Sequence, residues 1–364
     1  MNAGRTSGEL GERGSLSGML GIDVPVFLGP FGGLSSVELT ATVSELGGLG
    51  GYGLYGYDAA RIQQTAAELR AKTARPFALN LWLPLEEPGE AADAADAAFD
   101  QAVDALRPIF DELGLAVPAR PDRYLPSFDE QVETALAASP AVLSFVFGVP
   151  PAEVVEAAHQ RGIAVAGTAT TVDEAVALAE GGVDAVVATG MEAAGHRVSF
   201  LRQAEESLVG SFALIPQVVD AVDVPVIAAG GIADRRGVAA AFALGASGVQ
   251  VGTAFLATRQ SAATDAHRRA IGETPADRTV LTRAMSGRLA RGALNRAVRQ
   301  IEDAGRIAPF PVQNWLTGRF RAEAGSRGIG ELQSLWLGQG ASLARFEDAA
   351  DVFAELVAGV PARE

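Results

Sequence analysis

The feature that most constrains the fold of this chain is the alternation of short apolar runs with longer segments of helical period. The apolar runs are mostly continuous, without the polar residue at every second position that marks a strand with one wet face. Continuous runs are typical of parallel strands that are buried on both faces. Eight such strands are predicted, at Val24–Leu28, Leu49–Tyr52, Phe77–Leu81, Val142–Phe147, Ile163–Ala166, Ala185–Ala188, Val226–Ala229 and Gly248–Val251.

Helical segments separate the predicted strands, and glycines end them. Thr171–Glu180 carries its apolar residues on one side and is followed by Gly181 and Gly182, and Asp234–Leu244 is followed by Gly245. Glycine is common after a helix because this position often needs a positive φ. Eight strand–helix units predict an α/β fold, a (β/α)8 TIM barrel, with a doubly wound open sheet as the alternative on pattern alone.

The pattern divides the 364 residues into three parts. Residues 1–20 are rich in Gly and Ser and are expected to be a flexible N-terminal extension. Residues 21–258 hold the eight strands and are expected to form the barrel, whereas residues 259–364 are predicted to be a helical appendage packed on it, because the alternation stops there. Within the barrel, Glu86–Asp104 is interpreted as a solvent-exposed helix face and Leu115–Pro126 as an extended loop over the barrel mouth.

Composition excludes several classes of function. The 29 basic and 44 acidic residues give a net charge of −15, which disfavours nucleic acid and anionic membranes as partners because both repel a negative surface. There is no Cys, and the three His residues are too few for a His-rich site, so no metal is expected. No apolar run is long enough to cross a membrane, and the opening residues lack the apolar core of a secretory signal. The expected compartment is the cytoplasm.

Glycine falls mainly just after the predicted strands, where a parallel barrel builds its active site. The seventh strand is followed by Gly230 and Gly231, and the eighth by Gly252 and Thr253. Glycine lets backbone N–H groups approach a phosphate with no Cβ in the way, and barrels often bind phosphate after these two strands. The sequence therefore predicts a phosphate site, for a substrate or a cofactor. Two tight turns that need Gly for backbone reasons are the alternative.

His196 is the strongest candidate for a catalytic side chain. It follows the sixth predicted strand, next to Gly195, so its imidazole is expected to point into the barrel mouth. A pKa of about 6.5 in its ordinary state suits an imidazole to proton abstraction or to hydrogen bonding with an anion. His159 and His267 are expected to be exposed and not catalytic. Asn80 is the one amide side chain in an apolar strand, and a buried amide needs hydrogen-bond partners. Either the ring of a bound ligand or the backbone of the barrel could supply them.

Several short motifs together resemble those of a known enzyme family. The motifs are Gly29–Gly33, Asn80, Ser144–Gly148, Glu192–His196, Ala229–Ile232, Gln250–Thr253, Ser286–Gly292, Pro311–Asn314 and Leu335–Ala341. They look like those of the nitronate monooxygenases, formerly called 2-nitropropane dioxygenases, which are FMN-dependent (β/α)8 barrels. The resemblance runs from about Val24 to Ala344. The FMN-dependent enoyl-acyl-carrier-protein reductases share the motifs from Leu214 to Thr253 almost equally well, and only the C-terminal stretch, especially Trp336–Gln339, favours the nitronate family.

The resemblance implies an activity and a role for each candidate residue. The reaction would be oxidation of alkyl nitronates, and of nitroalkanes, by O₂ to a carbonyl compound and nitrite, with FMN as cofactor. His196 would be the active-site base or the group that holds the nitronate. The partners would be the small-molecule substrate and O₂, and a homodimer is one assembly that fits. The residues expected to bind the cofactor are Pro30, Phe31, Asn80, Thr189, Ala194, Gly195, Gly230, Gly231, Gln250, Val251, Gly252 and Thr253.

The chain departs from the family pattern in one segment. The family usually has Gln where this chain has Thr189, Gly where it has Ala194, and Gly where it has Val198. Thr189 is shorter than Gln, so the hydrogen bond that a Gln amide would make to the flavin edge is lost or is made through water. Three alternatives stay open: an FMN-dependent NAD(P)H reductase of enoyl thioesters or quinones on the same barrel, a flavin-binding or phosphate-binding protein without turnover, and a flavin-free barrel acting on a sugar phosphate.

Overall fold

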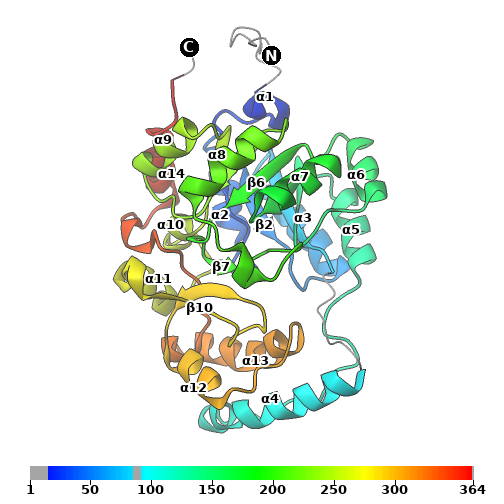
Figure 1. Cartoon of the computed structure of the whole chain (residues 1–364), viewed down its shortest axis with the longest axis vertical. Helices are drawn as coiled ribbons and strands as arrows, with labels where there is room; N and C mark the ends of the chain where they lie inside the picture. Colours follow the sequence, from blue (N-terminus) through cyan, green and yellow to red (C-terminus); the bar gives the residue numbers. More distant parts are fainter. Residues whose placement is uncertain (1–14, 85–91, 363–364) are drawn as a thin grey trace.

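Eight parallel strands form a closed barrel in the computed structural model, which describes residues 15–84 and 92–362 (Figure 1). The hydrogen-bonded order is β1-β9-β8-β6-β5-β4-β3-β2. The two ends of this order meet because Phe27 and Leu49 form a parallel bridge, and the Leu28 N–H donates to the Leu49 carbonyl at 2.9 Å. The predicted TIM barrel is confirmed, and the open sheet is wrong. The strands are β1 (Val26–Leu28), β2 (Gly50–Gly53), β3 (Phe77–Trp82), β4 (Val142–Val146), β5 (Ala164–Ala169), β6 (Ala185–Thr189), β8 (Val226–Ala229) and β9 (Gly248–Val251).

Helices cover the outside of the barrel and bury their apolar sides against the strands. In α7, for example, Ala175 and Leu178 are fully buried, and the Thr171 side chain caps the helix by accepting from the Glu174 N–H at 3.3 Å. The eighth helix comes from the far C-terminus, because α14 packs on α2 and α9. The barrel helices are α2 (Val37–Glu45), α3 (Ala59–Lys72), α5 (Phe128–Ala137), α6 (Ala152–His159), α7 (Val172–Glu180), α8 (Ser211–Ala221), α9 (Arg235–Ala243) and α14 (Ala349–Val357).

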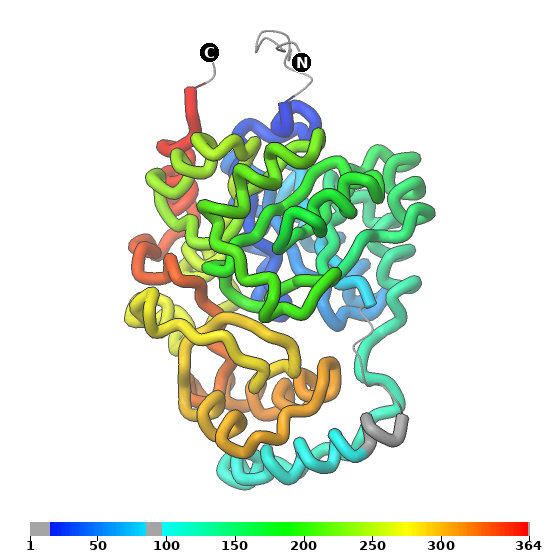
Figure 2. Tube along the Cα trace, in the orientation of Figure 1, coloured from blue at the N-terminus to red at the C-terminus, as the bar shows by residue number. Residues whose placement is uncertain are grey.

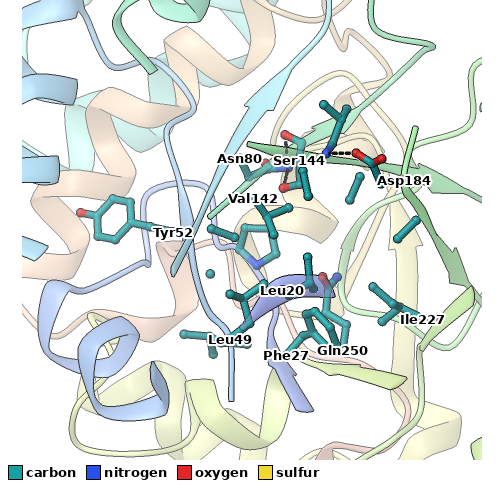
Figure 3. A pocket seen from close by; sticks show the side chains of 18 of the residues that line it. Leu20, Phe27, Leu49, Tyr52, Asn80, Val142, Ser144, Asp184, Ile227 and Gln250 are labelled. Atoms are coloured by element: carbon teal, nitrogen blue, oxygen red, sulfur yellow. Dashed lines mark hydrogen bonds between the residues drawn. The ribbon is translucent and has the colours of Figure 1, made fainter. Parts of the chain in front are cut away.

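A short helix, α1 (Leu16–Leu20), closes the barrel at the amino ends of its strands. Leu16 and Leu20 are buried against Phe27, Leu49 and other residues at the start of the strands. Figure 3 shows Leu20 beside an apolar cavity of about 30 Å³ inside the barrel. The expectation of a flexible extension is therefore wrong from Ser15 onward, because these leucines cover an apolar barrel end. The remainder of that extension, 1–14, lies outside the described residues.

A second layer covers the opposite end of the barrel, at the carboxyl ends of the strands. Figures 1 and 2 show α4, α12 and α13 gathered there, away from α1. Helix α4 (Ala92–Leu113) is inserted between β3 and α5 and packs on α13 (Val312–Ser326). The prediction of an exposed helix face fails in its described part, because Phe99, Ala102 and Val103 are buried against this layer. Residues 86–91 of that prediction lie outside the described residues.

Residues 259–364 were expected to be a helical appendage. The covering layer that they form also contains strands. Strands β10 (Thr279–Thr282) and β11 (Ala290–Ala293) are antiparallel, and β11 also pairs with β7 (Gly195–His196) from the barrel mouth. These strands are short and have at most two apolar residues in a row, and β7 forms only through pairing with a distant segment. Helices α11 (Asp265–Glu273) and α12 (Arg296–Ala304) also belong to this region, and the short helix α10 (Thr253–Leu256) precedes it. Nowhere in the described chain does a helix combine the length and apolarity that a membrane span requires.

Removing the apolar plug should destabilise the barrel. We expect Leu20→Ala to lower the free energy of unfolding by about 2 to 5 kcal/mol, because the change leaves a cavity at a buried site. Met19→Ala is the matched control, since Met19 is 41% exposed in the same helix and its loss should change stability by less than about 0.5 kcal/mol. Urea denaturation measures both. Equal effects of the two changes would contradict the plugging role of α1.

Candidate active site

A cavity of about 380 Å³ lies at the carboxyl ends of the strands, under the covering layer. Its volume is in the range of small-molecule sites, about 300 to 1,000 Å³. The fold brings residues from six of the eight barrel strands and from the loops after them to one place. The predicted residues that line it are Pro30, Phe31, Asn80, Thr189, Ala194, Gly195, His196, Gly230, Gly231, Gln250, Gly252 and Thr253.

Val251 is the one predicted binding residue whose side chain does not line this cavity. It is 1% exposed and packs with Val26, Leu28 and Phe255 in the cluster between strands and outer helices. Successive side chains of a strand point to opposite faces, so Gln250 faces the barrel interior while Val251 faces the helices. The Val251 side chain therefore does not reach the cavity, and the binding role expected for this residue stays a prediction.

One end of the cavity is built from backbone. Gly230 and Gly231 have φ values of +102° and +73°, a region that favours glycine, and a Cβ on Gly230 would lie 3.0 Å from the Ser211 Oγ. Among the described residues, the N–H groups of Gly231, Gly252 and Thr253 have no acceptor in the protein. Because three unpaired donors border one cavity, this end can hold an anion such as a phosphate.

A loop of the C-terminal region lies across this same end. The Gly338 N–H donates to the Thr253 Oγ1 at 3.1 Å, and the Gln339 N–H donates to the Glu192 carbonyl at 2.9 Å. The approach is so close that a Cβ on Gly340 would lie 2.8 Å from the Gly231 oxygen. The motif Leu335–Ala341 is thus part of the site wall, although it begins 83 residues after Gly252 in sequence.

His196 lies on β7 and borders the cavity. Its Nε2 is 2.8 Å from the Ser286 Oγ, and Ser286 also donates to the Arg288 carbonyl at 3.1 Å. A hydroxyl has one proton, so with that proton on the carbonyl it is Nε2–H that donates to Ser286. The other ring nitrogen, Nδ1, then keeps its lone pair and has no partner among the described residues.

The surroundings of His196 keep its imidazole neutral. The ring centroids of Trp82, Trp336 and Phe147 lie 5.0, 5.7 and 6.4 Å from that of His196. Burial, and then the positive charges of Arg288 and Arg321, lower the pKa of His196 from its ordinary 6.5 to about 3. A group with a lowered pKa loses its proton well below neutral pH. At neutral pH this imidazole is therefore a proton acceptor and not a cation.

Asn80 is held by the neighbouring strand. Its Nδ2 donates to the Ser144 Oγ at 3.0 Å and to the Ser144 carbonyl at 3.2 Å. The side chain is 4% exposed and borders both the large cavity and the small one below it (Figure 3). Its carbonyl oxygen has no donor among the described residues, so that atom can accept a hydrogen bond from a ligand in the cavity.

Comparisons with known proteins agree with this geometry. The family model of nitronate monooxygenase matches residues 13–359. A "Probable nitronate monooxygenase" of Staphylococcus haemolyticus is 38% identical over 334 residues, covering 90% of this chain and 92% of the relative. One of Staphylococcus aureus is 36% identical over 348 residues, with coverages of 95% and 97%. The chain belongs to the nitronate monooxygenase family.

Solved structures support the same assignment. The crystal structure of nitroalkane oxidase from Streptomyces ansochromogenes superposes with a TM-score of 0.82 at 35% identity, covering 93% of this chain and 95% of that one. The structure of FabK from Thermotoga maritima superposes with a TM-score of 0.72 at 28% identity, and each chain is covered to 94%. As a member of the nitronate monooxygenase family, the protein is an oxidoreductase.

Where this family member departs from the usual pattern, a buried arginine holds the loop. Thr189 ends β6 and borders the cavity, and its carbonyl accepts from Arg197 Nη2 at 3.1 Å. Arg197 Nη1 donates to the Gly190 carbonyl at 2.7 Å, and the Arg197 residue is only 2% exposed. Ala194 lines the cavity next to His196. The loop that presents His196 is therefore tied to β6 without a Gln at position 189.

The other two histidines lie away from the cavity. His159 is exposed, as expected, with its Nε2 2.9 Å from Asp184. The expected exposure of His267 is wrong, because it is 2% exposed and its Nε2 donates to the Trp336 carbonyl at 2.8 Å. It ties α11 to the loop that crosses the site.

Several residues that border the cavity, or that form hydrogen bonds to residues bordering it, were not predicted from the sequence. Tyr55 follows β2, Trp82 ends β3 and Arg321 lies on α13, and no motif marked them, because only tertiary packing brings these three elements to one cavity. Ser286, Asn314 and Trp336 fall inside motifs of the family resemblance, which could have pointed to them individually.

The neutral state of His196 can be measured directly. We expect its imidazole ¹³C and ¹H shifts to stay constant from about pH 8 down to about pH 5, because its pKa is lowered to about 3. The signal that disappears in His196→Asn identifies the ring among the three histidines. A midpoint near 6.5 for that signal would contradict the role of burial and of the two arginines.

Proposed function

We propose that the protein binds FMN in this cavity and oxidises alkyl nitronates, and nitroalkanes, with O₂ to a carbonyl compound and nitrite. The observation that carries the proposal is one cavity with unpaired backbone donors at one end and a neutral imidazole on its wall. The family, and the likeness to nitroalkane oxidase, support the same substrates. When bound, the flavin would supply the redox chemistry that no side chain provides, taking electrons from the nitronate and passing them to O₂.

The residues of the cavity fit this cofactor. The N–H groups of Gly231, Gly252 and Thr253 would bind the phosphate, which needs several donors. The Glu192 carboxylate beside this end is already engaged, because it accepts from the Ser211 N–H at 2.9 Å and from its Oγ at 2.8 Å. The Asn80 carbonyl oxygen would accept from a polar group of the ring system.

His196 would act on the substrate in its neutral form. A neutral nitroalkane must lose its α-proton to become a nitronate, and the free lone pair on Nδ1 can accept that proton. General base catalysis of this kind contributes about 10² to 10⁴ in rate. The Ser286 hydroxyl holds the ring from the other nitrogen, at 2.8 Å. A preformed nitronate has no proton to lose, so for this substrate the imidazole would only position the anion.

A second candidate is an FMN-dependent NAD(P)H reductase on the same barrel, acting on enoyl thioesters or quinones. It is favoured by the likeness to FabK, which extends over 94% of both chains. Identity is lower there than with nitroalkane oxidase, at 28% against 35%, so the nitronate reaction is the first proposal. The two candidate reactions differ in the electron donor, which is a nitronate in the first and NADH or NADPH in the second.

The electron donor can be identified by anaerobic mixing. We expect the purified protein with FMN to absorb at about 450 nm and to lose this absorbance on mixing with an alkyl nitronate. NADH and NADPH alone should leave it unchanged. Bleaching by a nicotinamide without nitronate would establish the reductase instead. A colourless preparation that takes up no FMN would overturn the cofactor proposal, and bound FMN that neither donor reduces would indicate a binding protein.

The base role predicts a difference between two substrate forms. We expect His196→Asn to lower kcat/KM for a neutral nitroalkane by about 10² to 10⁴ and to affect its preformed nitronate far less, because only the nitroalkane has a proton to lose. His159→Asn is the matched control, since His159 is exposed and outside the cavity, and it should leave both rates unchanged. Equal losses on both substrates in His196→Asn would leave only a binding role for this residue.

A further inference from the structure

The proposed reaction gives no role to the small cavity inside the barrel, which has a volume of about 30 Å³. We call it the barrel cavity, and the larger cavity beside His196 the site cavity. Helix α1 closes the barrel cavity at the amino ends of the strands, where Leu20 lines it (Figure 3). Four residues border both cavities: Pro30, Asn80, Ser144 and Gln250. The barrel cavity therefore lies between α1 and the site cavity.

Small side chains leave this space open. The interior of a TIM barrel is usually filled by branched residues such as Val, Ile and Leu. Here Ala78 of β3, Ala166 of β5 and Ala185 of β6 line the cavity instead. Ala166 is paired in register with Ala185 on one side and with Ser144 on the other. Because Ser144 is paired in turn with Asn80, the open space reaches the residues that border the site cavity.

The barrel cavity offers few partners to a water molecule, which makes about three hydrogen bonds when it is buried. The Tyr52 hydroxyl is bonded to another tyrosine at 3.1 Å and points away from the other labelled side chains in Figure 3. Asp184 is partly exposed to solvent, and its Oδ2 accepts a backbone N–H at 2.7 Å. The other polar side chains of the wall, those of Asn80, Ser144 and Gln250, lie at the border with the site cavity. Away from this border the barrel cavity is apolar, and apolar cavities in proteins stay free of water.

Size and polarity together favour a small apolar ligand. One water needs about 10 to 15 Å³ of cavity volume, so 30 Å³ has room for a molecule of two heavy atoms. Apolar cavities in proteins accept apolar gases such as xenon. O₂ is diatomic and apolar, and the transfer of an apolar molecule from water into apolar surroundings is favourable. O₂ is also the second substrate of the proposed reaction.

We propose that the barrel cavity is a binding site for O₂, which holds this substrate next to the site cavity on the side of Asn80 and Gln250. The inference rests on the proposed function, because it takes O₂ to be the oxidant of the reduced flavin. Such a site raises the concentration of O₂ beside the site cavity. It does so outside the space that the flavin and the nitronate would occupy.

Xenon is the probe that tests binding without turnover. In crystals of the full chain with FMN, kept under xenon pressure, we expect a xenon atom in the barrel cavity, in van der Waals contact with Ala78, Ala166 and Ala185. Ordered water in the barrel cavity under xenon, or xenon only at other places, would overturn the proposal. Because no reaction takes place, this result is independent of whether a nitronate reduces the flavin.

Filling the barrel cavity tests its use in the reaction. Ala166→Val adds two methyl groups to the wall of the cavity, so the xenon site should disappear. Stopped-flow mixing of the reduced protein with O₂ should then give a rate constant for flavin oxidation that is lower by about fourfold or more, the factor that corresponds to burial of one methylene-sized group. The anaerobic rate of flavin reduction by a nitronate should be unchanged, because the site cavity keeps its residues.

Ala240→Val is the matched control. Ala240 is exposed on α9, so the same chemical change should alter neither half-reaction there. If Ala166→Val does not fold, Ala78→Val fills the cavity from β3 and takes its place. Loss of the xenon site with an unchanged rate constant for O₂, or equal losses in both half-reactions, would overturn the proposal.

Discussion

The site depends on one constraint, the closure of the parallel sheet between β1 and β2. The hydrogen bond from the Leu28 N–H to the Leu49 carbonyl joins the two ends of the strand order. Because closed parallel strands all end at one rim, Asn80 on β3, Thr189 on β6 and Gln250 on β9 border a single cavity. At the other rim the same closure leaves an apolar opening, which α1 fills.

Burial and charge then divide the cavity into regions with different chemistry. At one end, glycines expose backbone donors, and the neighbouring carboxylate of Glu192 is already bonded to Ser211. On the wall, burial and then the neighbouring cationic side chains lower the pKa of His196, which keeps its imidazole uncharged well below pH 6.5 as well as at neutral pH. The positive charge that lowers this pKa also attracts anions, and Arg321 places part of it on the wall of this cavity.

The structural features that could be predicted from the sequence are those marked by a pattern of neighbouring residues. The continuous apolar runs predicted all eight barrel strands to within a few residues, and glycines after strands pointed to the rim where the cavity lies. Features that depend on contacts between distant segments were missed: the α1 plug, the pairing of β7 with β11, and the burial of His267. The Val251 side chain points away from the cavity because side chains alternate along β9. Arg321 lies in a helix that no pattern connects to the barrel mouth.

The most direct test of this account is a crystal structure of the protein with FMN bound. We expect a phosphate within hydrogen-bond distance of the Gly231, Gly252 and Thr253 nitrogens, and a flavin ring in the cavity beside His196. A phosphate at Arg321, with the ring turned toward the glycines, would contradict it.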